Sequence, residues 1–274
     1  MSITFRKLTE KHELHDLERL EAAVWSKDSV IPLHMTLTVS KFGGLFLGAF
    51  DGDEMIGFLY SFPGFTDGKP HLCSHMLGFL PAYRKRGLGV QMKWLQREEA
   101  LRMGHTRITW TYDPLETVNA TLNIAKLGGI VRQYLPNCYG ELNDDMNKGL
   151  PTDRFLVEWL LTSRRVAERH ANQQRRQIPT DGIPRVLTCK IGPDGHPRPA
   201  AHRLNAGEEM LLLPVPAHFQ HLKKADMGAA AAWRTVTREL FLHYFACGYA
   251  VVDVMRSDAE PLVCYLLQKG ADLS

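Results

Sequence analysis

LGFLPAYRKRGLG, residues 77–89, joins a strand pattern to a helix pattern through consecutive basic residues and two glycines. Gly87 and Gly89 let the backbone turn tightly and let a ligand approach it closely. The first turn of a helix adds N–H groups without intrahelical partners and the positive end of the helix dipole. The stretch therefore predicts a turn that binds a pyrophosphate. A basic turn that only connects a strand to a helix is the structural alternative.

Two other phosphate-binding motifs do not fit this stretch. A P-loop requires the pattern GxxxxGK[ST], which the sequence lacks. A dinucleotide-binding fingerprint requires a third glycine after Gly89, but Met92 stands in its place. That fingerprint also follows an early strand of a βαβ unit, whereas a hairpin pattern precedes this one. Dinucleotide binding is not expected.

The residues around the stretch predict an α+β or α/β domain of about 160 residues. Before it, AFDGDEMIGF (49–58) predicts a β-hairpin with Asp51-Gly52 in its turn. After it, we expect a helix that ends at Gly104, a strand TRITWTYD (106–113) and a helix from about residue 116 to 127. The patterns IVRQYL and DRFLVEWLL (153–161) predict further strands.

The motif Arg84-x-x-Gly87-x-Gly89, after LGFLPAYR and before an amphipathic helix, resembles the acyl-CoA signature of the GNAT superfamily of N-acyltransferases. The resemblance covers roughly residues 3–161, because ITFRKL, AFDGDEMIGF and NATLNIAKLGG also fall where that family has counterparts. The full length and the runs SHMLGFLPAYRKRGLG and DRFLVEW resemble a subgroup of long predicted acetyltransferases. The implied fold is α+β with a mixed sheet, followed by a smaller C-terminal α/β lobe.

The resemblance implies which residues bind acyl-CoA. Backbone groups of Leu77 and Phe79 would pair with the pantetheine arm where their strand diverges from TRITWTYD, and Asn119 on the later helix would contact the same arm. The amides across the glycine turn would hold the pyrophosphate. The motif residues assigned to CoA are Arg84, Lys85, Arg86, Gly87, Leu88 and Gly89.

The catalytic acid and base are predicted with alternatives. Many family members place a tyrosine near the end of the later helix, where it can protonate the leaving thiolate, but Ile124 occupies that place here. Tyr139 is the predicted substitute, with Tyr134 as a second candidate and a packed structural tyrosine as the alternative. The strand before the motif has no acid, so His75 is the predicted base. His71, Cys73 and His75 would share one face of a regular strand, and a structural role for His75 is the alternative.

Composition supports a soluble, cytoplasmic protein without a membrane partner. The chain has 274 residues, a formal net charge of +3 and no apolar run near the roughly 20 residues that span a bilayer. Its first residues lack the apolar region of a signal peptide. The five cysteines form no CxxC pair, so free thiols in a reducing compartment are expected. His71/His75 and His218/His221 lack a third clustered ligand, so no metal is expected.

The predicted organisation is an acyltransferase domain (1–162), a basic linker or helix (163–180) and a C-terminal lobe (181–274) that is either separate or an extension of the first sheet. Arginines of the segment 164–176 raise the possibility of contacts to nucleic acid or to the 3′-phosphate of CoA, and a solvated helix is the simpler interpretation. These arginines are Arg164, Arg165, Arg169, Arg175 and Arg176.

The predicted function is transfer of an acyl group, acetyl first, from acyl-CoA to the amine of a small molecule by direct attack. An amino acid is one candidate acceptor. The alternatives are a succinyl-CoA-dependent amino-acid N-succinyltransferase and a non-catalytic acyl-CoA-binding regulatory module, which Ile124 motivates. No nucleic acid partner is expected, and a homodimer is left open.

Overall fold

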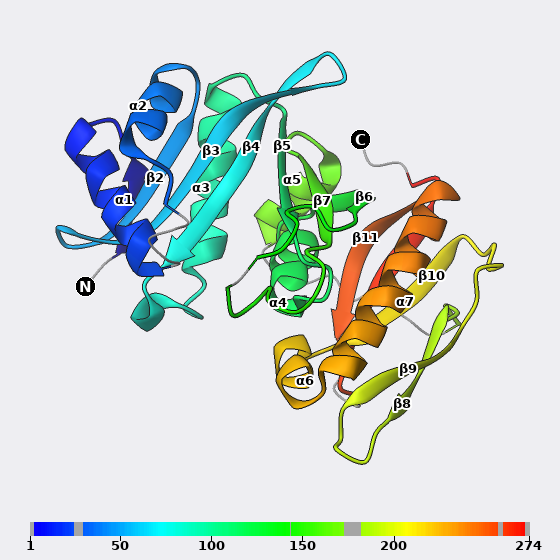
Figure 1. Ribbon diagram of the computed structural model, residues 1–274. Helices are drawn as coiled ribbons and strands as arrows, with labels where there is room; N and C mark the ends of the chain where they lie inside the picture. Colours follow the sequence, from blue (N-terminus) through cyan, green and yellow to red (C-terminus); the bar gives the residue numbers. More distant parts are fainter. Residues whose placement is uncertain (1–2, 25–29, 143, 173–181, 257–259, 272–274) are drawn as a thin grey trace. The chain divides into compact units, whose positions relative to one another are not determined.

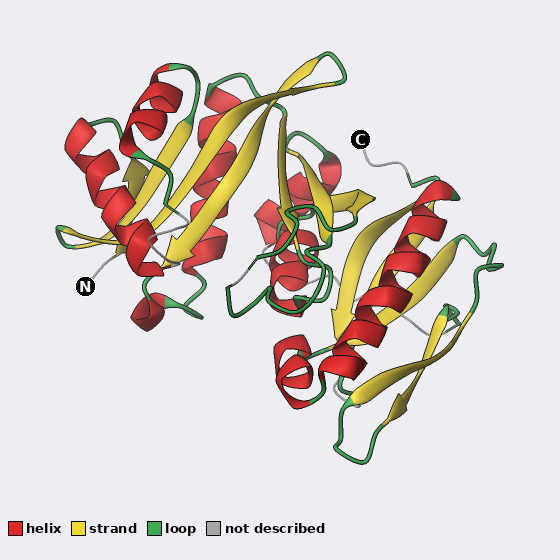
Figure 2. Ribbon diagram, viewed as in Figure 1, coloured by secondary structure: helices red, strands yellow, loops and turns green. Residues whose placement is uncertain are grey.

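The computed structural model describes residues 3–24, 30–142, 144–172, 182–256 and 260–271. The chain forms two compact units, which are described separately. The first comprises residues 1–110 and 160–162, and the second comprises residues 111–159 and 163–274. Both are α+β, with mostly antiparallel strand pairing (Figures 1 and 2). The mixed α+β class expected from the sequence is confirmed.

The first unit is a five-stranded sheet in the order β1-β2-β3-β4-β5, with helices on both faces (Figure 2). Its strands are β1 (Ile3–Lys7), β2 (Leu45–Asp51), β3 (Glu54–Thr66), β4 (Lys69–Phe79) and β5 (Arg107–Tyr112), the last of which ends in the second unit. Its helices are α1 (Lys11–Val24), α2 (Leu33–Lys41), α3 (Leu88–Arg102) and the 3₁₀ turn η2 (Pro81–Tyr83). The predicted hairpin is confirmed, because Asp51 pairs with Glu54 across a two-residue turn.

The two faces of this sheet differ in what covers them. On one face, leucines of α1 pack against Phe46, Phe58 and Tyr60 in a hydrophobic cluster. On the other face, polar side chains of α3 bond Ser61 and Ser74. Neighbouring residues of a strand point to opposite faces. Tyr60 and Ser61 therefore show that α1 and α3 cover opposite faces.

The regular pairing of β4 is interrupted on both sides, by a bulge against β3 and by the end of its pairing with β5. Against β3, Tyr60 pairs with Met76 but Ser61 pairs with Ser74, so His75 is the extra residue of a β-bulge. Against β5, which is parallel, the described pairs are Leu72 with Ile108 and Cys73 with Thr109. We call the point directly after these pairs the fork. From Ser74 to Phe79, β4 pairs with β3 on one side only.

The second unit is built on strands in the order β7-β6-β11-β12-β10, with a separate β8-β9 hairpin. Its strands are β6 (Ile130–Leu135), β7 (Arg154–Leu160), β8 (Leu187–Ile191), β9 (Pro197–His202), β10 (Met210–Pro216), β11 (Tyr249–Arg256) and β12 (Leu262–Lys269). Its helices are α4 (Thr117–Ala120), the π-helical turn η3 (Thr121–Lys126), α5 (Arg164–Asn172), α6 (Phe219–Ala225) and α7 (Met227–Ala246). Trp233, Leu240 and Tyr244 of α7 are fully buried, as their spacing predicts.

The C-terminal strands extend the sheet of β6 and β7 within this unit, because Val251 of β11 pairs with Val131 of β6. The compact units therefore have boundaries other than 162 and 181, and the predicted division into 1–162, 163–180 and 181–274 stays a prediction. No described helix has the length and apolar character that crossing a membrane requires.

The expectation of a solvated helix at 163–180 is wrong for part of that segment. Within α5, Arg169 bonds Asp253 at 2.8 Å, and both side chains are at least nine-tenths buried. Arg165 donates to the backbone carbonyls of Gly128 and Val252. These two arginines hold α5 to its own unit. Arg175 and Arg176 lie outside the described residues.

Candidate acyl-CoA site

Side chains of the basic turn before α3 fix its position through contacts with β2, with β4 and with each other. The hydroxyl of Tyr83 donates to Asp51 Oδ2 (2.9 Å), and the Nε of Arg84 donates to the carbonyl of Phe79 (3.0 Å). The guanidinium of Arg86 lies over the ring of Tyr83, 5.0 Å from its centre. Arg84 therefore links the turn to the end of β4, while Lys85 is exposed. The three cations leave this end of α3 strongly positive.

Positions 87 and 89 of the motif are suited to glycine for different structural reasons. Gly87 has φ +79° at the N-terminal cap of α3, a conformation that only glycine adopts without strain. Gly89 lies inside the first turn, and a Cβ built there would meet only Leu77 of β4, at 3.8 Å. A Cβ on Gly87 would meet nothing within 4 Å. Leu88 between them is buried and anchors the helix. Neither glycine is therefore packed tightly at the position of a Cβ.

In the second half of β4, the backbone groups of alternate residues face opposite sides of the strand. In an antiparallel ladder, alternate residues exchange hydrogen bonds with the partner strand. The N–H of Leu80 donates to Ile56 of β3, so even-numbered residues from Met76 onward face β3. Leu77 and Phe79 therefore turn their backbone groups toward the side that β5 leaves beyond the fork. The carbonyl of Phe79 already accepts the bond from Arg84.

His75 lies on the bulge and on the face covered by α1. Its exposed ring stacks at the edge of the cluster, with ring centres 5.0 Å from Phe62 and 5.7 Å from Tyr60. This partial removal from water lowers the pKa of His75 below 6.5. The imidazole is therefore neutral at physiological pH, as a proton acceptor must be.

Glu21 of α1 is a buried acid that the sequence analysis missed. It is fully buried and accepts a bond from the hydroxyl of Tyr60 at 2.6 Å. Burial raises the pKa of Glu21, and the bond from Tyr60 opposes part of that rise. Its spacing from Leu14 and Leu17 gives a signal, because it continues the apolar stripe of α1. His75 and Glu21 thus both contact Tyr60.

Lys93 of α3 is a second buried ionisable residue that the sequence analysis missed. Its Nζ donates to Ser74 Oγ (3.2 Å) and Gln96 Oε1 (2.9 Å), and it lies 3.6 Å from the ring centre of Trp110. Gln96 in turn donates to Ser61 and Ser74. Burial lowers the pKa of Lys93 to about 7, and the neighbouring Cys73 thiol opposes this. Lys93 continues the buried side of α3 formed by Leu88 and Met92.

Tyr139 and Asn119 belong to the second unit, whereas His75, Leu77, Phe79 and the residues 84–89 belong to the first. Tyr139 is half exposed, and its hydroxyl bonds Thr111 Oγ1 at 2.7 Å. Asn119 is partly buried on α4. Tyr134, the second candidate acid, is buried and donates to Asp153, and this pairing together with burial raises its pKa well above 10. Ile124 is fully buried, within the π-helical turn.

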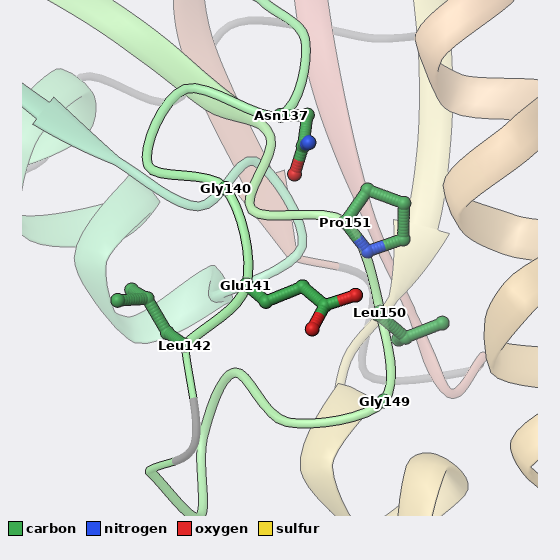
Figure 3. A pocket seen from close by; sticks show the side chains of 7 residues that line it. All are labelled: Asn137, Gly140, Glu141, Leu142, Gly149, Leu150 and Pro151. Carbon is green, nitrogen blue, oxygen red and sulfur yellow. The ribbon is translucent and has the colours of Figure 1, made fainter.

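The loop after β6 encloses a hollow of about 420 Å³ in the second unit (Figure 3). Glu141 reaches from one side of the loop toward Leu150 and Pro151 on the other. A hydrogen bond joins the two ends of the loop: the N–H of Tyr139 donates to Thr152 Oγ1 (3.0 Å). None of the residues predicted for the site lines this hollow.

The histidine pairs lack further metal ligands. The rings of His218 and His221 are stacked with centres 5.7 Å apart, and His71 bonds Arg107 at 3.2 Å. Among the described residues, no group of three or more His, Cys, Asp or Glu side chains could hold a metal ion.

The chain thus combines a basic glycine turn before α3 with a strand, β4, whose described pairs with its parallel neighbour β5 end at Cys73. Residues 11–126 match the model of the Acetyltransferase (GNAT) family. The match supports a GNAT acetyltransferase domain over these residues, and the resemblance to the superfamily is confirmed. Similarity to the long subgroup stays a prediction. A search of curated proteins gave no match.

Solved acetyltransferase structures resemble slightly more than half of the chain. A chain of the NatC complex bound to Gag peptide and CoA has a TM-score of 0.48 and 16% identity, covering 59% of this chain and 100% of its own. A GNAT-family acetyltransferase from Streptococcus pneumoniae has a TM-score of 0.48 and 14% identity, with 57% and 98% covered. An aminoglycoside 6′-acetyltransferase type Ii has a TM-score of 0.44 and 19% identity, and the match covers 60% of this chain and 99% of its own. The assignment rests on the family model, and these scores add no argument to it.

Proposed function

We propose that the protein transfers an acyl group, acetyl first, from acyl-CoA to the amine of a small molecule. The observation that carries this proposal is the start of α3, where a Cβ on Gly87 would meet nothing within 4 Å and one on Gly89 would meet only Leu77, at 3.8 Å. A pyrophosphate placed there would meet helix N–H groups and three basic side chains. Support also comes from Leu77 and Phe79, whose backbone groups face away from β3 and are proposed to pair with the pantetheine arm. The contact of Asn119 with the same arm stays a proposal from the resemblance.

The chemistry asks little of the protein beyond placement and proton transfer. CoA supplies the activated thioester. The turn and β4 orient it, which converts the reaction into an effectively unimolecular step. His75, neutral because its pKa is lowered, accepts a proton from the acceptor amine. Tyr139 is the residue proposed from the sequence to return a proton to the sulfur.

A cofactor titration tests the proposal directly. Isothermal titration of the wild type with acetyl-CoA and succinyl-CoA should give micromolar binding, and tighter binding of one thioester identifies the acyl group. Gly89→Glu should weaken binding at least 100-fold, because its carboxylate enters the pyrophosphate space. Gly89 suits this test better than Gly87, whose positive φ would add backbone strain. Gly89→Ala and Gln91→Glu, an added acid on the exposed side of the same turn, are the controls. Equal affinity in wild type and Gly89→Glu would refute the site.

A non-catalytic acyl-CoA-binding module is the second candidate function. The observation that favours it is Ile124, which is fully buried where many family members have a tyrosine. The two functions differ in turnover across a panel of amines, including amino acids. For the enzyme, His75→Gln should lower turnover at least tenfold and remove the acid limb of the pH profile, and Tyr139→Phe should lower turnover. Binding without turnover of any amine would support the module.

A further inference from the structure

The backbone of the basic turn is in an unfavourable conformation at Lys85. Lys85 has φ +63°, in the left-handed region that residues with a Cβ rarely adopt. Gly87, two residues later, has φ +79° and adopts this region without strain. A non-glycine residue persists in such a conformation only where the surrounding structure holds it, and such residues cluster at ligand sites. The contacts on either side of Lys85 therefore decide whether the turn keeps its shape.

Tyr83 connects this turn to the hairpin of β2 and β3. Its hydroxyl donates to Asp51 Oδ2 at 2.9 Å, and this bond raises the pKa of the phenol. The guanidinium of Arg86 lies over the ring of Tyr83, 5.0 Å from its centre, which is a cation–π contact. Since Lys85 lies between Tyr83 and Arg86 in the chain, the ring of Tyr83 joins the two ends of the unfavourable segment.

Asp51 gives Tyr83 a rigid point of attachment. Its backbone is fixed on both sides, because it pairs with Ile3 of β1 and with Glu54 of β3. Within the part of the chain that the structure describes, Tyr83 supplies the only hydrogen bond to the carboxylate of Asp51, and the other oxygen is buried without one. A carboxylate near a site for an anion opposes binding by Coulomb repulsion. The hydrogen bond of Asp51, and not its charge, can therefore favour a pyrophosphate at this turn.

We propose that Asp51 and Tyr83 are positioning residues that hold the turn 84–89 ready for the pyrophosphate of CoA. Asp51 fixes the hydroxyl end of Tyr83, and the ring of Tyr83 fixes the guanidinium of Arg86. All of these residues belong to the first unit. A turn that is ordered before the ligand arrives loses less conformational freedom on binding, which raises affinity. This inference rests on the proposed acyltransferase function, because that function makes CoA the ligand of the turn.

The charge of Asp51 and its hydrogen bond predict changes of opposite sign in the affinity for CoA. Asp51→Ala removes a negative charge, so repulsion alone would make CoA bind more tightly. Loss of the hydrogen bond should instead weaken binding about fivefold in isothermal titration with CoA. Asp51→Asn keeps an acceptor oxygen and should restore affinity to within about twofold of wild type. Asp53→Ala is the control, because it removes an exposed acid of the same hairpin turn and should not weaken binding.

Tyr83→Phe tests the same hydrogen bond at physiological pH without changing any charge. It keeps the ring beneath Arg86 and should weaken CoA binding as much as Asp51→Ala does. The double variant should lose no more affinity than either single variant, because both remove one interaction. A general loss of structure would instead add up in the double variant, and Asp51→Asn would not restore affinity.

The outcomes separate this inference from the function on which it rests. If the wild type binds CoA and Asp51→Ala binds it equally well or more tightly, the positioning role is refuted while CoA binding stands. If the wild type does not bind CoA, both proposals fall. If Asp51→Ala does not fold, Tyr83→Phe decides the matter, and wild-type affinity in that variant refutes the role.

Discussion

The cations of the turn before α3, in the first unit, and two buried arginines of the second unit have opposite environments. In the turn before α3, Arg84, Lys85 and Arg86 are exposed, and the described ion pairs include none of them. In the second unit, Arg234 and Arg169 are almost fully buried and bond Asp113 and Asp253. A buried charge is tolerated only when a partner compensates it. Exposed cations at a helix start keep their field available for an anion. Arginine thus holds the fold together where it is buried, and it is available for the proposed ligand where it is exposed.

Removing a buried arginine should have the largest effect on stability. Arg234→Met leaves Asp113, which also contacts Arg154, without its main bidentate partner. We expect a loss of about 3–5 kcal/mol in the free energy of unfolding, because the remaining carboxylate stays buried. Chemical denaturation measures it. Arg203→Met breaks an exposed pair with Glu208 and should cost less than about 1 kcal/mol. Equal losses in the two variants would contradict the comparison.

Acid should destabilise the second unit through Asp153. Burial alone would raise the pKa of this carboxyl, but bonds from Arg238, Tyr134 and the Asn137 N–H lower it overall. A lowered folded-state pKa stabilises the protein above the unfolded value of about 3.9, and that contribution is lost as pH falls toward the folded value. Urea unfolding between pH 7 and 3 should therefore show a falling stability, with a shallower fall in Asp153→Asn. The exposed Asp53→Asn should keep the wild-type slope.

The smallest change in stability should come from the exposed turn. Arg86→Met should leave the free energy of unfolding within about 0.5 kcal/mol of wild type, because its contacts are at the surface. Its affinity for CoA should fall about tenfold and become less sensitive to salt, since a screened charge contact is lost. Arg102→Met, at the far end of α3, is the control for both measurements. If Arg86→Met were less stable than wild type but bound CoA equally well, the comparison between the exposed turn and the buried arginines would be contradicted.

Local patterns predicted most of the first unit, and tertiary contacts decided the rest. The Asp51-Gly52 hairpin and the helix after Gly87 follow from short-range signals, which act through backbone geometry. Lys93 looks like a surface residue in VQMKWLQ, because nothing local reveals that Ser74 and Trp110 surround it. Arg169 looks solvated until Asp253, 84 positions later, is placed beside it.

Sequence patterns also did not predict the π-helical turn or the strand order of the second unit's sheet. The helix expected from 116 to 127 is α-helical only over Thr117–Ala120 and continues as a π-turn. The pairing of β11 with β6 depends on segments far apart in the chain, so no periodicity could indicate it. The residues predicted for CoA divide between the units: Leu77, Phe79 and residues 84–89 belong to the first, and Asn119 belongs to the second with Tyr139.

The single described pair between β6 and β11 has a consequence for how the protein is made. Val131 leaves the ribosome about 120 residues before its partner Val251. At about 5–20 residues per second, the edge of the β6–β7 hairpin waits roughly 6–24 s for the strand that covers it. An uncovered edge can pair with another chain during that time. A chain that stops near residue 162 would leave that edge without β11 permanently.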